Sequence, residues 1–245
     1  MEEGMVKLFK RLLAIKKVAI IGGGKYAIFK SLLLDRLGRS EKLLNNLFLF
    51  PTTATSFYRY ERGWKRMYAH TLTREQRARI KKTFQRVFDE IGYVHPKKIY
   101  GELIEDRHTQ VTFSVYGQDV VKMLGKRGIR MKEQWKKKYT STKMKIANRM
   151  AKYLPDLEVR AAGFTSIDVT RKGIDKAYGL RQIEKNLNVR LKDMIFIGDA
   201  ITPGGNDYAV VRTGVDYIQV TGPKGTTAII QFLLKNASGD LPNHI

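Results

Sequence analysis

The first 70 residues alternate between apolar runs that predict strands and amphipathic runs that predict helices. Apolar side chains recur at helical spacing from Met5 to Leu13, and the first continuous apolar run, Val18 to Ile21, ends at three glycines. A second apolar run is stopped by Pro51. This order is typical of a parallel α/β sheet. The expected elements are a helix at 5–15, a strand at 18–21, a helix at 25–37, a strand at 46–50 and a hairpin at 54–70 that turns near Arg62-Gly63.

The middle of the chain has a different pattern, helix-strand-strand repeated twice. Thr73 and Gln76 have the spacing of a capping box, and the apolar positions that follow predict an amphipathic helix. The second helix is expected to end before Pro155. This pattern indicates an antiparallel sheet with helices on one face. The elements after the first helix are strands near 100–106 and 109–116, a helix at 131–153, and strands near 157–162 and 165–170.

Strand and helix alternate again after Gly173. The expected elements are a helix at 174–187, a strand at 194–198, a helix from about 206, a strand at 216–220 and a helix at 224–235. The two alternating parts predict one α/β core, built from residues 1–72 and 171–245. An α+β cap domain, residues 73–170 in the order αββαββ, is inserted between them.

Composition narrows the classes of function. The chain has 245 residues, no cysteine and a net charge of +23. Disulfides and thiolate chemistry are therefore excluded, which suits a cytoplasmic protein. No apolar stretch is long enough to span a membrane. Between Lys122 and Lys152 there are twelve Lys or Arg residues and one acid. A solvated helical face explains this run best, and a nucleic-acid-binding surface is the alternative.

The segment FIGDAITPGGNDY, residues 196–208, follows a predicted buried strand and carries two acidic residues around a glycine-rich loop. Ligands of open α/β sheets bind beyond the carboxyl ends of the strands. Carboxylates there suit Mg²⁺, which prefers hard oxygen ligands. A structural explanation would make Asp207 a helix N-cap and Asp199 a turn residue. The two acidic residues in one loop favour a site.

Two further strand ends carry suggestive residues. Gly22, Gly23 and Gly24 precede a helix, so their amides are candidates for binding phosphate, although tight turns also use glycine. Lys176 opens the helix before the 194–198 strand, where a cation opposes the helix dipole. A nearby anion would explain this lysine, and a solvent-facing position is the alternative.

These three strand ends, in this order and with an insert between the first and second, resemble the haloacid-dehalogenase-like (HAD) superfamily. FIGDAITPGGNDY, GIDKAYGL and VAIIGGG are similar to its motifs in subfamily IIB, the phosphomannomutase-like group. Cap segments 102–118 and 166–176 are similar as well, so the resemblance covers nearly the whole chain. It implies a Rossmann-like core with a parallel sheet and an inserted cap, and phosphoryl transfer through an aspartyl-phosphate.

The resemblance also implies roles for individual residues. Asp199 would bind Mg²⁺, with support from Asn206 and Asp207, and Lys176 would offset charge on the phosphoryl group. Gly22, Gly23 and Gly24 would contact the phosphate. In the cap, Arg107 and Asp168 match positions that contact the substrate. Without the resemblance, Arg107 would form a surface ion pair with Glu105 or Asp106, and Asp168 would be an exposed strand residue.

Two departures from the family pattern matter. The chain contains no D-x-D, so the D-x-D-G-T motif that carries the nucleophile in the family has no counterpart. We expect either a start further upstream or a protein that binds without catalysis. The family's mutases carry an arginine where this chain has Gln118, which favours a phosphatase over a phosphomannomutase. The sequence thus predicts a cytoplasmic Mg²⁺-dependent phosphatase, a hydrolase of small phosphorylated metabolites such as sugar phosphates. The alternatives are a mutase and a non-catalytic ligand- or nucleic-acid-binding protein.

Overall fold

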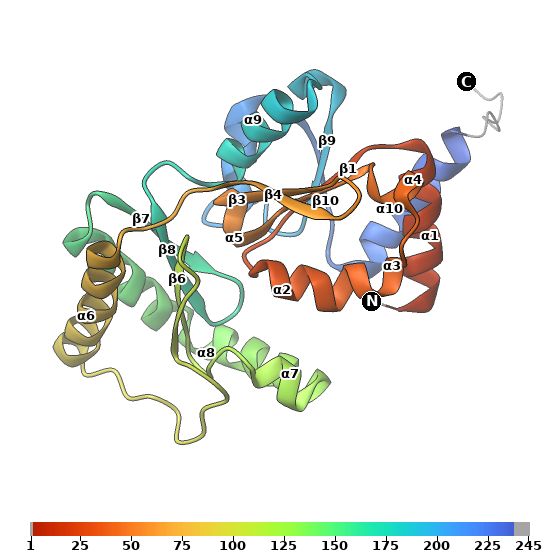
Figure 1. Ribbon diagram of the computed structural model, residues 1–245. Helices are drawn as coiled ribbons and strands as arrows, with labels where there is room; N and C mark the ends of the chain where they lie inside the picture. The colour runs from red at the N-terminus through yellow and green to blue at the C-terminus, as the bar shows by residue number, and fades with distance from the viewer. Residues whose placement is uncertain (1, 238–245) are drawn as a thin grey trace. The chain divides into compact units, whose positions relative to one another are not determined.

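The computed structural model describes residues 2–237, and the chain forms two compact units (Figure 1). One unit consists of Met1–Tyr68 and Asp175–Ile245, and the other of Ala69–Ile174. The first is mixed α/β and the second has helices on an antiparallel sheet, as the sequence predicts. Within residues 2–237, no helix combines the length and the apolar character that crossing a membrane requires.

The first unit contains two separate sheets. Four strands pair in the order β1-β2-β3-β4, with β1 and β2 parallel, and two more strands, β9 and β10, pair in parallel. Among the described residues β1 and β9 each pair on one edge only. The strands are β1 (Val18–Ile21), β2 (Leu47–Phe50), β3 (Ser56–Tyr60), β4 (Trp64–Ala69), β9 (Ile195–Gly198) and β10 (Asp216–Gln219).

The unpaired edges of β1 and β9 explain why these strands are less buried than the sequence predicts. The sequence predicts buried strands at β1 and β9, yet all four residues of β1 are only half-buried and Ile195 is 50% exposed. By contrast β2, which lies between β1 and β3, keeps Leu47, Leu49 and Phe50 fully buried. A strand with neighbours on both edges loses more solvent contact than a strand with one.

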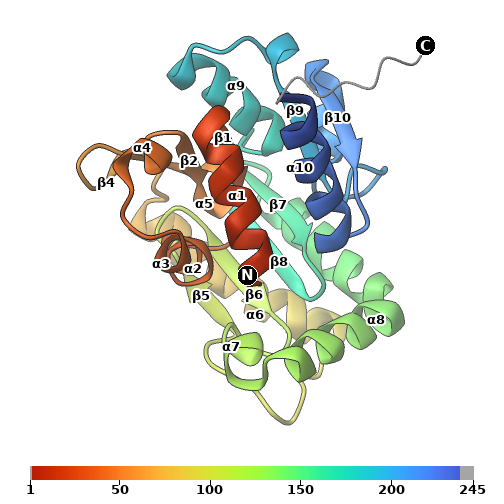
Figure 2. The same ribbon diagram turned by 90° about the vertical axis from the view of Figure 1, so that its right-hand side faces the viewer.

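Helices cover both faces of the first sheet. Successive residues of β2 point to opposite faces. Leu47 and Leu49 pack with α1 and α10, which lie side by side in Figure 2, whereas Phe50 packs with α9 and η3. The helical elements of this unit are α1 (Glu3–Ile15), α2 (Tyr26–Phe29), the π-helical η1 (Lys30–Leu34), α3 (Asp35–Leu37), α4 (Glu41–Leu44), α5 (Pro51–Ala54), α9 (Lys176–Leu187), η2 (Leu191–Asp193), η3 (Tyr208–Thr213) and α10 (Pro223–Ala237).

The second unit is an antiparallel sheet with the order β5-β6-β8-β7. Its core lies between one face of this sheet and the helices α6 and α8, for example where Phe84 meets Phe113 and Ile146. The capping box at Thr73 is present, and Gly92 ends α6 in the left-handed conformation. The elements are α6 (Arg74–Ile91), β5 (Ile104–Asp106), β6 (Val111–Ser114), α7 (Val120–Leu124), α8 (Lys126–Tyr153), β7 (Leu157–Ala162) and β8 (Ser166–Arg171).

Candidate functional site

The loop after β9 buries one carboxylate and exposes another. Asp207 is 1% exposed, and its Oδ2 accepts a hydrogen bond of 3.1 Å from the Ala200 amide. Gly198 makes this arrangement possible, because a Cβ at position 198 would lie 2.7 Å from Asp207 Oδ2 and 2.6 Å from the ring of Phe196. The glycine of the G-D motif therefore gives Asp207 room to fold back over the strand end.

Lys176 and Asp207 form an ion pair between Nζ and Oδ1, with little solvent access to either side chain. This carboxylate is the anion that the lysine at the start of α9 requires. The N-cap role that was the structural alternative for Asp207 is not observed, since its side chain makes no cap hydrogen bond to η3. Asp207 instead holds the ammonium group of Lys176 beyond the end of β9.

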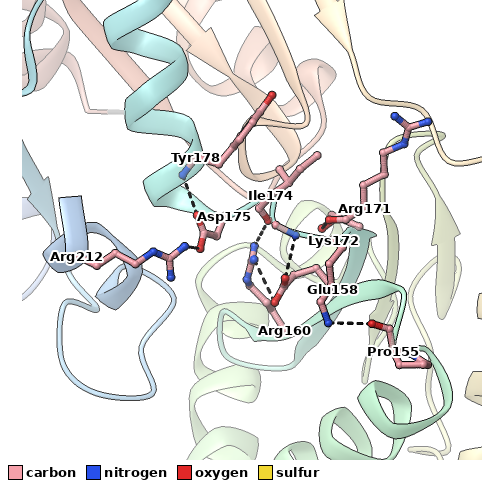
Figure 3. A network of polar contacts seen from close by, with 11 residues as sticks. Pro155, Glu158, Arg160, Arg171, Lys172, Ile174, Asp175, Tyr178 and Arg212 are labelled. Atoms are coloured by element: carbon pink, nitrogen blue, oxygen red, sulfur yellow. Dashed lines mark hydrogen bonds and ion pairs between the residues drawn. The ribbon is translucent and has the colours of Figure 1, made fainter.

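Asp175 fixes the start of α9. Its Oδ1 accepts a hydrogen bond of 2.8 Å from the Tyr178 amide, and its Oδ2 accepts one from the guanidinium of Arg212 (Figure 3). The sequence analysis missed both contacts, although an aspartate directly before a helix is a signal for an N-cap. The two bonds position the first turn of the helix that carries Lys176.

Asp199 and Asn206 are exposed, and neither side chain has a hydrogen bond or ion pair within the part of the chain that the structure describes. The described residues contain no group of three His, Cys, Asp or Glu side chains able to hold a metal ion. Mg²⁺ bound by proteins often takes only one or two carboxylates, and water and phosphate complete its coordination. The unpaired oxygens of Asp199 and Asn206 fit such a site, whereas those of Asp207 are already engaged by Lys176 and Ala200.

The glycine turn after β1 is tied to the end of β2. Gly22 donates its N–H to the Phe50 carbonyl at 3.2 Å, so this amide is already used. The carbonyls of Gly24 and Gly22 accept from the amides of Thr52 and Thr53, both at 2.9 Å. These contacts brace the turn that was predicted to bind phosphate.

The sequence analysis also missed the backbone of the segment after β2. Thr52, Thr53 and Ala54 all have positive φ angles, between 48° and 66°, a region that non-glycine residues rarely adopt. Strain of this kind persists where the surroundings impose it, and it concentrates at functional sites. Consecutive left-handed residues leave no mark in the hydrophobic pattern, so nothing in the sequence indicated them.

Close packing of α9 brings these strand ends together. A Cβ at Gly179 would lie 2.8 Å from Ile21 and 3.1 Å from Ala54, so this glycine lets α9 approach the ends of β1 and β2. The same helix contacts η3, which directly follows Asp207. Three segments distant in the sequence therefore meet around the first turns of α9: the glycine turn after β1, the segment after β2 that contains Thr52 to Ala54, and the loop after β9 that contains Asp207.

In the second unit, hydrogen bonds connect Arg107 to Asp168. Arg107 donates to Glu105 at 2.6 Å and to the Gln118 amide oxygen at 2.9 Å. Gln118 donates to the Thr112 carbonyl at 3.0 Å, and the Thr112 hydroxyl donates to Asp168 at 2.8 Å. The network joins the two cap residues that the sequence analysis proposed. It includes the ion pair with Glu105 that was weighed as the simpler explanation of Arg107.

The structural alternative for Asp168 was wrong, because this residue is 6% exposed rather than a surface residue. Burial raises the pKa of Asp168 to about 6, while the nearby charge of Arg107 and the hydroxyl of Thr112 lower it in part. Burial also lowers the pKa of Lys132, close to Arg107 and Asp168. The polar face of this sheet therefore holds titratable groups whose charge is costly to bury.

Side chains near β7 bind the segment that follows β8, residues 172–174. Arg160 donates to the Ile174 carbonyl and pairs with Glu158 at 3.3 Å, and Glu158 in turn accepts from the Gly173 amide at 3.2 Å (Figure 3). Nearby, the Lys172 ammonium group donates to the Pro155 carbonyl at 2.9 Å. The residues just before Asp175 are thus fixed to β7 by side-chain contacts.

Solved structures with this fold are haloacid-dehalogenase-like hydrolases and a nucleotidase. The Plasmodium falciparum IMP-nucleotidase superposes with a TM-score of 0.66 at 13% identity, over 98% of this chain and 58% of that chain. A haloacid dehalogenase-like hydrolase from Bacteroides thetaiotaomicron gives a TM-score of 0.58 at 13% identity, over 93% of this chain and 91% of that one. At these identities the likeness shows the fold alone, a mixed α/β fold that this chain shares with haloacid-dehalogenase-like hydrolases.

Sequence comparison is more specific. A phosphomannomutase of Drosophila melanogaster is 39% identical over 83 residues, which are 33% of this chain and 31% of that protein. The matched part is thus about a third of the length of this relative. The family of eukaryotic phosphomannomutases matches residues 5–236, a range that includes the glycine turn, Arg107, Lys176 and the loop with Asp199 and Asp207. Because the match covers nearly the whole chain, this protein belongs to the eukaryotic phosphomannomutase family.

Proposed function

We propose that the first unit is a Mg²⁺-dependent phosphoryl-transfer site that acts as a phosphatase on a small phosphorylated metabolite, such as a sugar phosphate, in the cytoplasm. The observation that carries the proposal is the buried ion pair of Lys176 with Asp207, beside the unpaired carboxylate of Asp199. A fixed ammonium group beside hard oxygen ligands suits a phosphoryl group, whose transfer depends on stabilisation of negative charge.

Each residue has a distinct task in this proposal. Asp199 and Asn206 would hold Mg²⁺, which draws electron density from the phosphoryl oxygens when it is bound. Lys176 places its positive charge near the same oxygens. Asp207 keeps Lys176 in position. The glycine turn after β1 would contact the phosphate through an amide other than that of Gly22, which is already donated to Phe50.

The cap residues would contribute to substrate recognition. Arg107 is suited to a phosphate or carboxylate oxygen, and its guanidinium is oriented by Glu105 and Gln118. Asp168 would accept hydrogen bonds from substrate hydroxyls. Gln118 cannot supply the charge of the arginine that mutases carry at this position, which favours hydrolysis over intramolecular transfer.

Metal binding tests the proposal on the chain as printed. We expect Mn²⁺, a paramagnetic substitute for Mg²⁺, to broaden amide signals of residues near 198–207 in NMR spectra. Asp199→Asn should abolish the broadening. The matched control is Asp216→Asn, an exposed carboxylate on the neighbouring strand β10, which should leave it unchanged. Broadening that persists in Asp199→Asn would refute the assignment of the metal site.

Activity provides a second test. The family's nucleophile belongs to a D-x-D motif that this sequence lacks, so we expect the printed chain to turn over very little sugar phosphate. A chain extended upstream to include such a motif should be active, and Asp199→Ala should remove that activity. Full turnover by the printed chain would contradict the role of the missing aspartate.

The family match makes a phosphomannomutase the second candidate. A hexose 1-phosphate, supplied to the extended chain together with a bisphosphorylated hexose activator, separates the two reactions. Phosphorus NMR would show inorganic phosphate for a phosphatase and the 6-phosphate isomer for a mutase. Appearance of the isomer as the main product would replace our proposal by the mutase reaction.

A further inference from the structure

The second unit contains an aromatic hollow that shares no lining residue with the network of Arg107 and Asp168. Its volume is about 510 Å³, the size of a small-ligand site. It is formed by the segment after α6 and by one side of α8. Four aromatic side chains line it, together with a lysine and smaller groups; the four are Tyr93, Tyr116, Trp135 and Tyr139.

Among the four rings, that of Tyr139 is exposed, and the ammonium group of Lys138 lies 5.2 Å from its centroid. Tyr139 interrupts the helical backbone of α8 with φ −126° and ψ 25°, and its side chain is 39% exposed. Its ring centroid lies 5.6 Å from that of Trp135. The Tyr93 hydroxyl is buried and has no hydrogen-bond partner among the described residues. An unpartnered buried hydroxyl on a residue that lines the hollow is unusual in a folded protein.

A shallow basic groove, lined by residues of α8 alone, follows one face of this helix. It shares Lys145 with the aromatic hollow. Arg149 and Lys152 also line it, and no carboxylate does. Neither Lys145 nor Lys152 has an ion pair or hydrogen bond within residues 2–237. The nearby carboxylate of Glu90 is already paired with Arg86 at 2.8 Å. The groove therefore offers uncompensated positive charge.

Charge extends along the whole helix. α8 has 28 residues, which amount to about 42 Å of helix when the parts before and after the interruption at Tyr139 are added. Eleven of them are Lys or Arg, and Glu133 is the single acid. A free nucleotide would cover only part of this surface, whereas a chain of phosphates can follow more of its length. Alternation of aromatic and cationic groups is typical of surfaces that bind single strands, because bases stack on the rings and phosphates contact the cations.

We propose that the aromatic hollow binds an unpaired base of a single-stranded nucleic acid, while Lys145, Arg149 and Lys152 bind the phosphates that follow. Single strands are favoured because a base inside a duplex is stacked on its neighbours and cannot enter the hollow. All of these residues belong to the second unit, and the proposal does not depend on the function proposed for the first.

Binding of a labelled 12-residue oligouridylate, measured by fluorescence anisotropy, tests the proposal. Tyr139→Ala should weaken binding about 5- to 100-fold, the range for loss of one stacked base. Tyr217→Ala removes an exposed tyrosine of β10 and is the matched control. Equal effects of the two variants, or no effect of Tyr139→Ala, would overturn the assignment of the hollow.

Salt dependence tests the groove. The double variant Lys145→Gln, Lys152→Gln should reduce the slope of log affinity against log salt concentration by about 1.4, since each phosphate contact on a single strand contributes about 0.7. The control Lys42→Gln removes an exposed lysine of α4 and should leave the slope unchanged. An unchanged slope in the double variant would refute the phosphate contacts.

Two further measurements identify the ligand class. The chain has two tryptophans, so in a Trp64→Phe background the remaining fluorescence comes from Trp135. The oligonucleotide should quench it. Uridine monophosphate at the same nucleotide concentration should quench it far less, and a duplex of equal length should compete poorly. Tight binding of the mononucleotide, or equal competition by the duplex, would overturn the assignment to single strands.

Discussion

Lys176 and Asp207, 31 positions apart in the sequence, form an ion pair that is almost completely shielded from water. The lysine begins α9, and the aspartate ends the loop that follows β9. Burying either charge alone is costly, whereas the pair can be buried together. This contact therefore has a structural role in the first unit, in addition to its proposed role at the phosphoryl group.

Asp207→Asn should destabilise the first unit by about 3 to 5 kcal/mol, because it leaves the Lys176 ammonium group buried without a counter-charge. Urea unfolding followed by circular dichroism measures the loss. The matched variant Lys176→Met, combined with Asp207→Asn, should recover part of it, since the double variant buries no unpaired charge. If the double variant loses as much stability as Asp207→Asn and Lys176→Met lose in sum, the two side chains do not interact energetically.

Gly198→Ala tests the close approach between the end of β9 and the carboxylate of Asp207. A Cβ there would lie 2.6 Å from Phe196 and 2.7 Å from Asp207 Oδ2, so one of these groups must move. We expect a loss of about 1 to 3 kcal/mol, the usual cost of overpacking, together with a shift of the Asp207 signals in NMR spectra. Gly204→Ala provides a control with open space around the Cβ but a positive φ. Its cost should be confined to backbone strain, without a shift at Asp207.

Asp175 provides a prediction about the start of α9. Asp175→Ala removes both the cap to the Tyr178 amide and the contact with Arg212. Loss of an N-cap costs about 1 kcal/mol. Asp175→Asn keeps a capping oxygen but loses the charge, so it should cost less than the alanine variant. Urea unfolding of both variants checks the order, and an asparagine variant as unstable as alanine would assign the effect to the ion pair with Arg212 instead.

Local signals in the sequence predicted much of the fold. The capping box at Thr73 is present, and the apolar run before Gly198 forms a strand. Pro155 lies just beyond the end of α8, although α8 starts at Lys126, five residues earlier than its apolar pattern indicated. Glycine and proline impose such boundaries through the backbone alone, so one sequence is enough to locate them.

Long-range features could not be predicted in the same way. The division of the first unit into two sheets depends on which strand edges meet, and a hydrophobic pattern does not encode strand order. The pairing of Asp207 with Lys176 needed the fold, because only the packing of α9 brings these positions together. The burial of Asp168 was likewise hidden, since a lone aspartate in a strand is usually exposed.

Asp168 gives the last prediction, which concerns pH. Its pKa in the folded protein is about 6, above the ordinary value of 3.8, because burial disfavours the carboxylate. Between these two values the folded state binds more protons than the unfolded state, so the contribution of Asp168 to stability decreases as pH rises from about 4 to 6. Asp168→Asn removes this titration. Relative to the parent, the variant should therefore gain about 2 to 3 kcal/mol of unfolding free energy between pH 4 and pH 7.

Urea unfolding at pH 4, 5, 6 and 7 measures this gain. Asp156→Asn is the control with a pKa shift of the opposite sign, because the exposed carboxylate of Asp156 pairs with Arg79, which lowers its pKa. Because the pKa of Asp156 lies below the ordinary value of 3.8, most of its titration falls below pH 4. The variant should therefore change little relative to the parent between pH 4 and pH 7, the more so because the pair is exposed. If the difference in unfolding free energy between Asp168→Asn and the parent stays constant with pH, burial does not raise the pKa of Asp168, and this prediction is wrong.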